Sequence, residues 1–411
     1  MPQVRFTGPG RHCSLSIMRR VPPTLPEFVA VYGLLYAAFG VQSPFLPALL
    51  REQGLHPEEI GIVLGASTAI RVLAGPAISH AADRLHRHRP TLCGCAIVAA
   101  VAGFGYLMIH GLGSLLVVGL LHAAMLAPIV PLSDALATTA ARASEADEGR
   151  RFDYGWLRAS GSAAFIIGTM ISGWIAGKTS LPSIIWISGA LLVIGGIAAL
   201  LLPRLVGGAT PKWSRPPIVL DWALLLRLAV YRRILVVAAL VEGSHALHDA
   251  FSVIRWRAAG IELPIVGLLW SESVLSEVVV FLAIGPRLVR LLGPGGACAL
   301  AAGAGVIRWT VVAFTTSPAL LGFVQPLHGL TFALLHLACM RLIVQIVPVR
   351  LAATAQSIYG TLCVDLATAL LTLASGLLYE RVGGSAFLAM AALCLLALPM
   401  CAGLRLSCVQ A

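Results

Sequence analysis

Charged residues are scarce in this sequence, and the scarcity excludes an ordinary soluble protein. Asp, Glu, Lys and Arg make up 11% of the 411 residues, where a soluble domain carries about a quarter. Hydrophobic residues make up 58%, and the mean hydropathy is +0.89. A soluble fold of this composition would have too little polar surface to present to water. The composition therefore predicts a protein that lies largely in lipid.

Signatures of catalysis and of metal binding are also missing. The sequence has no CxxC pair and no P-loop, and no nucleophile–base arrangement or metal-ligand spacing stands out. The nine cysteines lie mostly inside apolar stretches, as small packing residues do. We therefore expect no enzyme activity, no metal, no cofactor and no direct use of ATP.

Long apolar runs fill most of the chain. A helix needs about 20 apolar residues to cross a bilayer, and lipid offers no partner for the unpaired backbone of an open sheet. Twelve stretches meet this length: 27–50, 59–80, 91–110, 114–136, 154–177, 182–203, 233–256, 265–286, 296–316, 318–342, 354–378 and 385–404. The prediction is an all-α membrane protein with twelve transmembrane helices.

The longest polar connection divides these helices into two halves. It spans 204–232 and contains several prolines and arginines, which is typical of a linker. We expect a six-helix bundle on each side of it, at 26–203 and 233–404, with tails at 1–25 and 405–411. Short matches between the halves indicate a repeat: Gly61-Ile62-Val63 with Gly267-Leu268-Leu269, and Ser172-Gly173 with Ser375-Gly376.

The basic residues predict the orientation in the membrane. With a cytoplasmic N-terminus, cytoplasmic segments carry twenty Lys or Arg, and external loops carry five, namely Arg51, Lys178, Arg255, Arg257 and Arg381. This positive-inside pattern places both termini in the cytoplasm. It also accounts for the net charge of +11 without nucleic acid as a partner.

The segment after the second stretch resembles the loop signature of the major facilitator superfamily. Asp83 and Arg84 match its acidic and first basic positions, while Ser79 and His86 replace two glycines. The resemblance implies that Asp83 and Arg84 have a structural and gating role, bracing the inner ends of neighbouring helices.

Further segments resemble the phenylpropionate permease family within that superfamily. They are Pro128–Leu136, Asp153–Gly155 with Arg158, Glu242–Ala246, Trp270-Ser271 with Glu277, Val306–Trp309, Leu327-His328, Leu335–Ala338 and Met340-Arg341. The resemblance runs from the first stretch to the twelfth. It implies a major facilitator fold of two pseudo-symmetric six-helix bundles, and a small aromatic carboxylic acid as substrate.

A more distant resemblance is to lactose-permease-type proton symporters. Arg308 and His328 stand where that family has an arginine and a histidine of its proton-coupling cluster. Thr331 replaces a coupling glutamate, and Glu277 lies one turn from that family's acid on the eighth helix. The resemblance implies proton coupling by a route that differs at these two positions.

Charges inside the membrane are the candidate functional residues, since each costs at least about 2.5–3.5 kcal/mol at the bilayer centre and needs a partner or a water-filled cavity. The proton-coupling candidates are Glu242, Asp249, Glu277, Arg308, His328 and Asp365. Glu242 and Asp249 share one helical face with His245, at spacing i, i+3, i+7. Burial favours a neutral carboxylate and a nearby arginine favours a charged one. The alternative interpretation is a set of static pairs that hold helices together.

Arg71 is the central charge of the first half, and Asp365 lies at a similar depth. Arg71 either pairs with Asp365 across the two halves or binds the carboxylate of a substrate with two parallel hydrogen bonds. Both interpretations stay open.

Other polar residues complete the candidate site. The remaining substrate-binding candidates are Tyr36, Gln42, His245, Trp270 and His328. Of these, the aromatic residues equally fit plain packing between helices. Asp134 and Arg158, near the cytoplasmic ends of their stretches, are predicted to form a structural pair.

Together these features predict a monomeric secondary transporter of the bacterial inner membrane that imports a small organic acid with protons. The alternatives are symport of neutral sugars or nucleosides, export of drugs or metabolites, and a non-transporting assembly role of the same fold.

Overall fold

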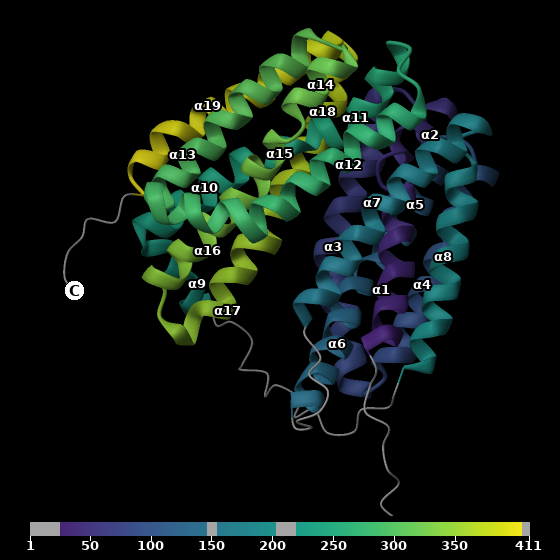
Figure 1. Ribbon diagram of the computed structural model, residues 1–411, viewed down its shortest axis with the longest axis horizontal. Coiled ribbons are helices and arrows are strands. Elements are labelled where there is room, and N and C mark those ends of the chain that lie inside the picture. Colours follow the sequence, from purple (N-terminus) through teal and green to yellow (C-terminus); the bar gives the residue numbers. More distant parts are fainter. Residues whose placement is uncertain (1–24, 146–153, 203–218, 405–411) are drawn as a thin grey trace, which may run out of the picture.

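The computed structural model describes residues 25–145, 154–202 and 219–404 (Figure 1). Every regular element within these ranges is a helix, which confirms the all-α prediction. Of the predicted tails, only Leu25 is described, and residues 1–24 and 405–411 lie outside the described residues. The predicted linker does so up to residue 218.

The first half consists of helices that are long, apolar and rich in Ala, Gly and Leu. They are α1 (Leu25–Gln42), α2 (Leu46–Glu52), α3 (Pro57–Leu85), α4 (His88–Met108), α5 (Leu112–Leu126), α6 (Ile129–Glu145), α7 (Tyr154–Lys178) and α8 (Ser183–Leu201). Short turns at 43–45 and 127–128 interrupt two of the spans without reversing the chain.

The second half is more irregular. Its elements are α9 (Val219–Arg227), α10 (Ala229–Gly243), α11 (His245–Ala258), α12 (Leu263–Val279), η1 (Val280–Ile284), α13 (Gly285–Phe314), α14 (Pro318–Val324), α15 (Leu327–Gly329), η2 (Leu330–Leu334), α16 (Leu335–Ile346), η3 (Val349–Leu351), α17 (Ala352–Ser357), η4 (Ile358–Asp365), α18 (Leu366–Val382), η5 (Gly383–Ala386) and α19 (Phe387–Ala402). Of these, η1, η2 and η4 are π-helical.

Ten helical runs in the described residues are long and apolar enough to cross a membrane. Two of them, Leu263–Phe314 and Thr354–Ala402, have 52 and 49 residues and exceed one span by far. Each turns back at a glycine with positive φ, Gly293 (68°) and Gly383 (54°), a backbone conformation that other residues rarely adopt. With two spans in each of these runs, the described residues form the predicted twelve spans.

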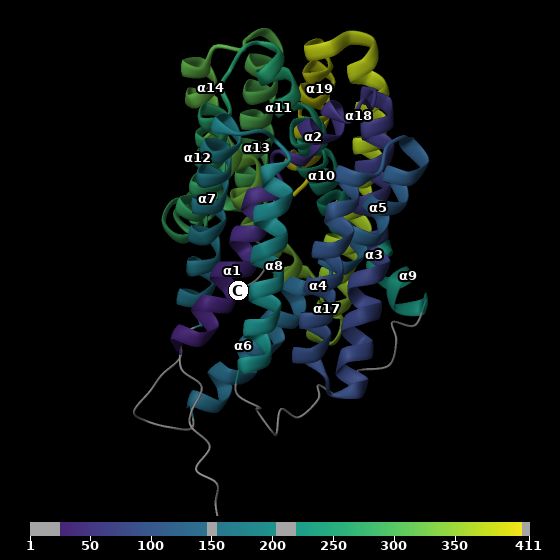
Figure 2. The same cartoon turned by 90° about the vertical axis from the view of Figure 1, so that its right-hand side faces the viewer.

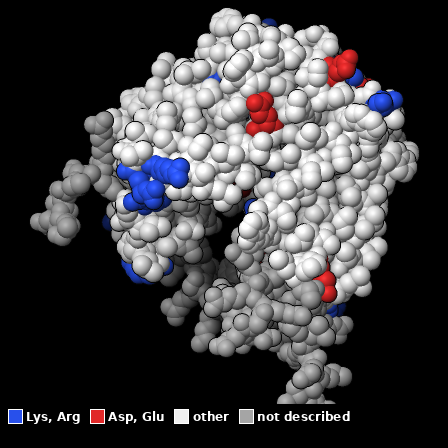
Figure 3. Space-filling model, in the orientation of Figure 1, with Lys and Arg blue, Asp and Glu red and all other residues white. Residues whose placement is uncertain are grey.

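The two halves lean together at one end and separate at the other (Figure 1). Seen from the side of α8, the helices run side by side along one direction, as expected for spans of a single bilayer (Figure 2). Figure 3 shows an exterior with few charges, hollowed between the halves below their contact. The hollow opens toward the end where α6, α9 and α17 lie.

Two glycine crossings form the closed end. A β-carbon on Gly61 of α3 would stand 2.8 Å from the Cα of Gly376 on α18. On the other side, a β-carbon on Gly173 of α7 would stand 2.7 Å from the Leu263 carbonyl oxygen and 3.3 Å from the Cα of Gly267. These four glycines are the ones that the two internal sequence matches contain. The repeat therefore marks pseudo-symmetric helix crossings between the halves.

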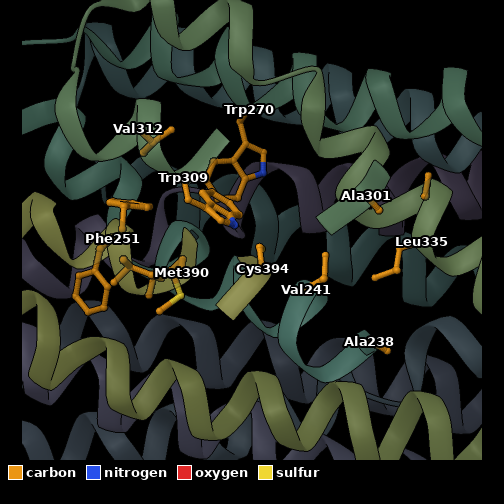
Figure 4. Packing of buried hydrophobic residues seen from close by; sticks show 14 of the residues in the cluster. Ala238, Val241, Phe251, Trp270, Ala301, Trp309, Val312, Leu335, Met390 and Cys394 are labelled. Carbon is orange, nitrogen blue, oxygen red and sulfur yellow. The ribbon is translucent and has the colours of Figure 1, made fainter. Parts of the chain in front are cut away.

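Large aromatic and aliphatic side chains fill the interior of the second half. Trp309, Phe251 and Met390 are buried in one apolar cluster with Cys394 (Figure 4). The exterior is equally apolar, since Leu282, for example, is 74% exposed in the absence of lipid. A helix bundle that is apolar inside and outside matches a lipid solvent.

Candidate transport site

A cavity of about 610 Å³ lies between the two halves. The first half contributes residues of α1 to α5, α7 and α8, and the second contributes residues of α10, α11, α12, α15, η2, η4 and α18. Its size lies within the range of small-molecule sites. Six candidate charged or histidine residues of the second half line it: Glu242, His245, Asp249, Glu277, His328 and Asp365.

A chain of hydrogen bonds leads from the core to this cavity. Arg308 is fully buried, and its Nη1 lies 2.8 Å from Nδ1 of His328. Nε2 of His328 in turn lies 2.6 Å from Oε1 of Glu277. Because a guanidinium can only donate, Nδ1 of His328 accepts and Nε2 carries the hydrogen that is donated to Glu277. The geometry thus fixes the tautomer of His328 and couples the cavity wall to a buried cation.

Aromatic rings and amides surround the rest of Arg308. Its Nη2 lies 2.9 Å from Oε1 of Gln325 and 3.4 Å from Nε2 of His248, and its guanidinium carbon lies 4.4 Å from the centre of the Trp309 ring. No described carboxylate comes within 4.0 Å of Arg308. The cation is therefore stabilised by hydrogen bonds and a ring face, with Glu277 reached only through His328.

A second polar branch runs beside the first. Glu242 accepts a hydrogen bond of 2.8 Å from the hydroxyl of Tyr359 on η4. His245 begins α11 after the break at Ser244, and its Nε2 lies 2.9 Å from Oγ1 of Thr331. Thr331 stands where lactose-permease-type symporters have a coupling glutamate. In this structure it is a neutral hydrogen-bond partner of His245.

Arg71, Asp249 and Asp365 face the cavity without a direct partner. Each side chain is exposed and lines the cavity, so it is open to the space between the halves. No ion pair within 4.0 Å joins Arg71 to either aspartate in this conformation. The Arg71–Asp365 pair, one of the two interpretations left open above, is therefore not formed within 4.0 Å in this structure, and the guanidinium is accessible to a ligand.

Apart from Arg71, the wall of the first half is polar but neutral. Nε2 of Gln42 lies 2.9 Å from Nε2 of His122, and Oε1 of Gln42 accepts a 3.1 Å hydrogen bond from Ser188. Nδ1 of His122 lies 2.8 Å from the carbonyl oxygen of Ala99. Because that carbonyl only accepts, His122 carries its hydrogen on Nδ1 and accepts from Gln42 on Nε2. Gln42 is thereby held in one orientation.

Trp270 lines the second half's side of the cavity and stacks on His248, with centroids 5.0 Å apart and planes at 13°. Tyr36 has a different setting. It stacks on Tyr32, accepts a hydrogen bond from Arg158, and is not among the residues that line the cavity. Its role in substrate binding stays a prediction.

Asp134 is the centre of a cluster between α1, α6 and α7. It lies 3.6 Å from Arg158 and accepts a 2.6 Å hydrogen bond from Tyr32. Asp83, at the end of α3, lies 2.6 Å from Nε2 of His88 at the start of α4, while Arg84 is exposed. These contacts hold helices and a tight turn, and a gating role for them stays a prediction.

Sequence reasoning missed four hydrogen-bond partners of the candidate residues: His122, His248, Gln325 and Tyr359. His248 lies one turn after His245, so the helical spacing could have indicated it. His122 is a histidine inside an apolar stretch, which is itself unusual. For Gln325 and Tyr359 the sequence carries no comparable signal, since neutral polar residues are common in membrane helices.

These features define a polytopic transporter of the major facilitator type: two helical bundles, a central cavity and buried charges that line it. The chain belongs to the family described as the MFS_1 like family, whose model matches residues 27–389. No function beyond transport follows from the family alone.

Two curated relatives are similar along most of the chain. A probable 3-phenylpropionic acid transporter of Escherichia coli (strain K12) is 32% identical over 374 residues, which cover 90% of this chain and 94% of that one. A maltose permease of Geobacillus stearothermophilus is 26% identical over 357 residues, covering 86% and 87%.

Solved structures show the same fold at low identity. The nucleoside transporter NupG superposes with a TM-score of 0.81 at 15% identity, over 93% of this chain and 99% of that one. A bacterial homologue of the human lysosomal transporter Spinster, in an inward-facing and unoccupied conformation, gives a TM-score of 0.68 at 14% identity, over 94% and 98%.

Proposed function

We propose that this protein imports a small aromatic carboxylic acid together with protons. It works by alternating access, as a monomer in the bacterial inner membrane with both termini in the cytoplasm. The observation that carries the proposal is Arg71, a cation without a partner inside a cavity whose opposite wall holds the Glu277–His328–Arg308 chain. The similarity to a probable 3-phenylpropionic acid transporter supports the same class of substrate.

Recognition of the acid rests on Arg71. A guanidinium meets a carboxylate with two parallel hydrogen bonds, and the pair is strong where water is excluded. The ring of the substrate then lies among aromatic side chains, since Phe39, Phe165, Trp270 and Phe332 line the same cavity. Such rings add contact area and stacking to the ionic interaction.

Proton coupling rests on Glu277. When it is charged, Glu277 accepts the hydrogen bond that orients His328, and His328 in turn accepts from Arg308. When it is protonated, this chain weakens, and the buried guanidinium loses part of its stabilisation. The proton on Glu277 therefore changes the energy of the whole second half, which is the coupling a symporter needs.

Symport of a neutral sugar is the second candidate. The similarity to a maltose permease favours it, as do the neutral hydrogen-bonding side chains of Gln42 and His122 in the cavity wall. Such a wall suits hydroxyl groups, but it leaves Arg71 without a function in binding. We therefore place it second.

Uptake into proteoliposomes tests both candidates. With an imposed proton gradient that is acidic outside the vesicles, labelled phenylpropionate is expected to accumulate inside above its external concentration. A protonophore is expected to abolish this accumulation. Labelled maltose and a nucleoside are run in parallel. Accumulation of maltose or a nucleoside without phenylpropionate would replace the first proposal by the second. Accumulation of phenylpropionate only when the gradient is reversed would identify an exporter.

A further inference from the structure

Two hydroxyl groups in the first half's wall of the cavity have no hydrogen-bond partner. Oγ of Ser67 is inaccessible to solvent and unpartnered. Tyr106 is 2% exposed, and its hydroxyl forms no hydrogen bond within the described part of the chain. Both residues line the cavity. Buried polar groups in native proteins are nearly always paired, so the buried, unpartnered hydroxyl of Ser67 requires an explanation, and the unpaired hydroxyl of Tyr106 lies in the same wall.

The two hydroxyls lie close together. A β-carbon on Gly119 of α5 would stand 2.9 Å from Oγ of Ser67 and 3.5 Å from the hydroxyl oxygen of Tyr106. Ser67 of α3 and Tyr106 of α4 therefore direct their hydroxyls toward Gly119, a position on α5 that has no side chain. We call the pair of Ser67 and Tyr106 the hydroxyl pocket.

Neighbouring polar groups in the same wall are already paired. His122, whose ring meets the Tyr106 ring edge-on at 5.6 Å, uses both of its nitrogens. Gln42 uses its oxygen and one amide hydrogen. Ser67 and Tyr106 thus keep free hydrogen-bonding capacity in this wall, as do Ser43, Arg71 and the second amide hydrogen of Gln42.

The hydroxyl pocket and Arg71 belong to one binding site. Ser67 and Arg71 are four residues apart on α3, so they lie on the same face and about 6 Å apart along the helix axis. An aromatic ring with one substituent can bridge such a span. A carboxylate held by Arg71 therefore places the far side of the ring beside Ser67 and Tyr106.

From this geometry we propose that the preferred substrate is a ring-hydroxylated aromatic acid, whose ring hydroxyl is bound by Ser67 and Tyr106. The inference rests on the proposed function and narrows its substrate. A phenolic hydroxyl both donates and accepts, so it can donate to Oγ of Ser67 and accept from the hydroxyl of Tyr106. A substrate without that group leaves both orphans unpaired, and such sites discriminate against the incomplete ligand.

The test compares two acids in proteoliposomes with an imposed proton gradient. The probes are unsubstituted phenylpropionate and its ring-hydroxylated derivatives, which are isomers of one another. The wild type is expected to show a kcat/KM about tenfold higher for at least one hydroxylated isomer, the value of one to two neutral hydrogen bonds. Ser67→Ala and Tyr106→Phe are each expected to lower kcat/KM for that isomer more than for unsubstituted phenylpropionate, so that the ratio of the two values falls toward one.

Ser375→Ala is the matched control, since Ser375 also has a buried, unpartnered hydroxyl but does not line the cavity. It is expected to leave the preference intact. Equal transport of both acids by the wild type, or a preference that survives in both hydroxyl variants, would overturn the inference and leave the proposed function standing. A protein that transports neither acid would overturn both.

Discussion

A histidine separates the buried cation of this site from its nearest hydrogen-bonded carboxylate. Arg308 reaches Glu277 only through the ring of His328, with distances of 2.8 Å and 2.6 Å. A direct ion pair would hold both charges permanently. An intervening imidazole instead passes any change at Glu277 on to Arg308, because each hydrogen bond depends on which nitrogen carries the hydrogen. At the scale of single residues, this chain of hydrogen bonds is the route through which the proposed proton coupling would act.

Glu277→Gln tests this response. The amide keeps the size of the side chain and can still accept from His328, but it cannot bind and release a proton. Accumulation against a gradient is expected to fall to the level of equilibration, while exchange of labelled for unlabelled substrate continues in part. Uptake and counterflow in the same proteoliposomes measure the two activities. Uphill accumulation at the wild-type level in this variant would remove Glu277 from the coupling mechanism.

Arg71→Lys tests recognition of the carboxylate. Lysine keeps the charge but loses the planar fork that meets both oxygens, so the exchange is not conservative. Binding of an aromatic acid is expected to weaken by at least about 1.4 kcal/mol, a tenfold change in Kd. Thermal shift or calorimetry on the purified protein measures it.

The double variant Arg71→Ala with Asp365→Ala separates recognition from a static pair. If the two residues served only to pair in another conformation, removing both would restore stability and substrate affinity together. If Arg71 binds the acid, the double variant folds but does not bind it. Wild-type acid affinity in the double variant would refute recognition by Arg71.

Sequence alone could indicate the charged members of the site but not their neutral partners. Glu277, Arg308 and Asp365 stood out because a charge in an apolar stretch is costly and needs a reason. Gln325 and Tyr359 carry no such cost and were not predicted. The separation of Arg71 from Asp365 in this conformation was equally out of reach, since depth along a helix does not define the gap between two bundles.

At the scale of elements, each π-helical segment contains a candidate coupling residue or follows closely after one. Glu277 lies three residues before η1, His328 lies two residues before η2, and Asp365 ends η4. Among the described residues, all π-helical segments belong to the second half. Wider turns leave backbone groups less tightly bonded and are frequent at functional sites. The second half is therefore the bundle in which wider helical turns lie beside the residues proposed for proton coupling.

The glycine crossing between α3 and α18 gives a prediction at this scale. A β-carbon on Gly376 would stand 2.8 Å from the Pro57 carbonyl oxygen and 3.0 Å from the Cα of Gly61, which are backbone atoms that cannot rotate away. Gly376→Ala is therefore expected to separate the halves at the closed end. Spin labels on Thr179 and Glu262, exposed at that end, should report a longer distance, and transport should slow.

Gly33→Ala is the control for this crossing. A β-carbon there would meet nothing within 4 Å, and alanine favours a helix over glycine by up to about 1 kcal/mol. The control is expected to leave the label distance and the transport rate unchanged. An unaltered distance in Gly376→Ala itself would show that the crossing does not hold the closed end.

At the scale of the whole molecule, the length and the apolarity of the helical runs determine the fold. Runs of about 20 apolar residues leave few choices other than membrane helices, so the twelve spans could be predicted from composition. The conformation could not, because the sequence is the same in every state of a transporter. The structure closes one end with the glycine crossings and a 2.6 Å ion pair between Glu52 and Arg257, and it opens the cavity at the other.

The side on which this cavity opens follows from orientation, and the two lysines of the chain can establish it without any substitution. Lys178, at the end of α7, is expected outside, and Lys212, in the linker, is expected in the cytoplasm, because the basic residues gather on the linker's side. An amine-specific reagent that cannot cross membranes is therefore expected to modify Lys178 but not Lys212 in intact cells, as peptide mass spectrometry would detect. Permeabilised cells serve as the control, in which both lysines should react. Modification of Lys212 alone in intact cells would invert the topology, so that the cavity would face outward.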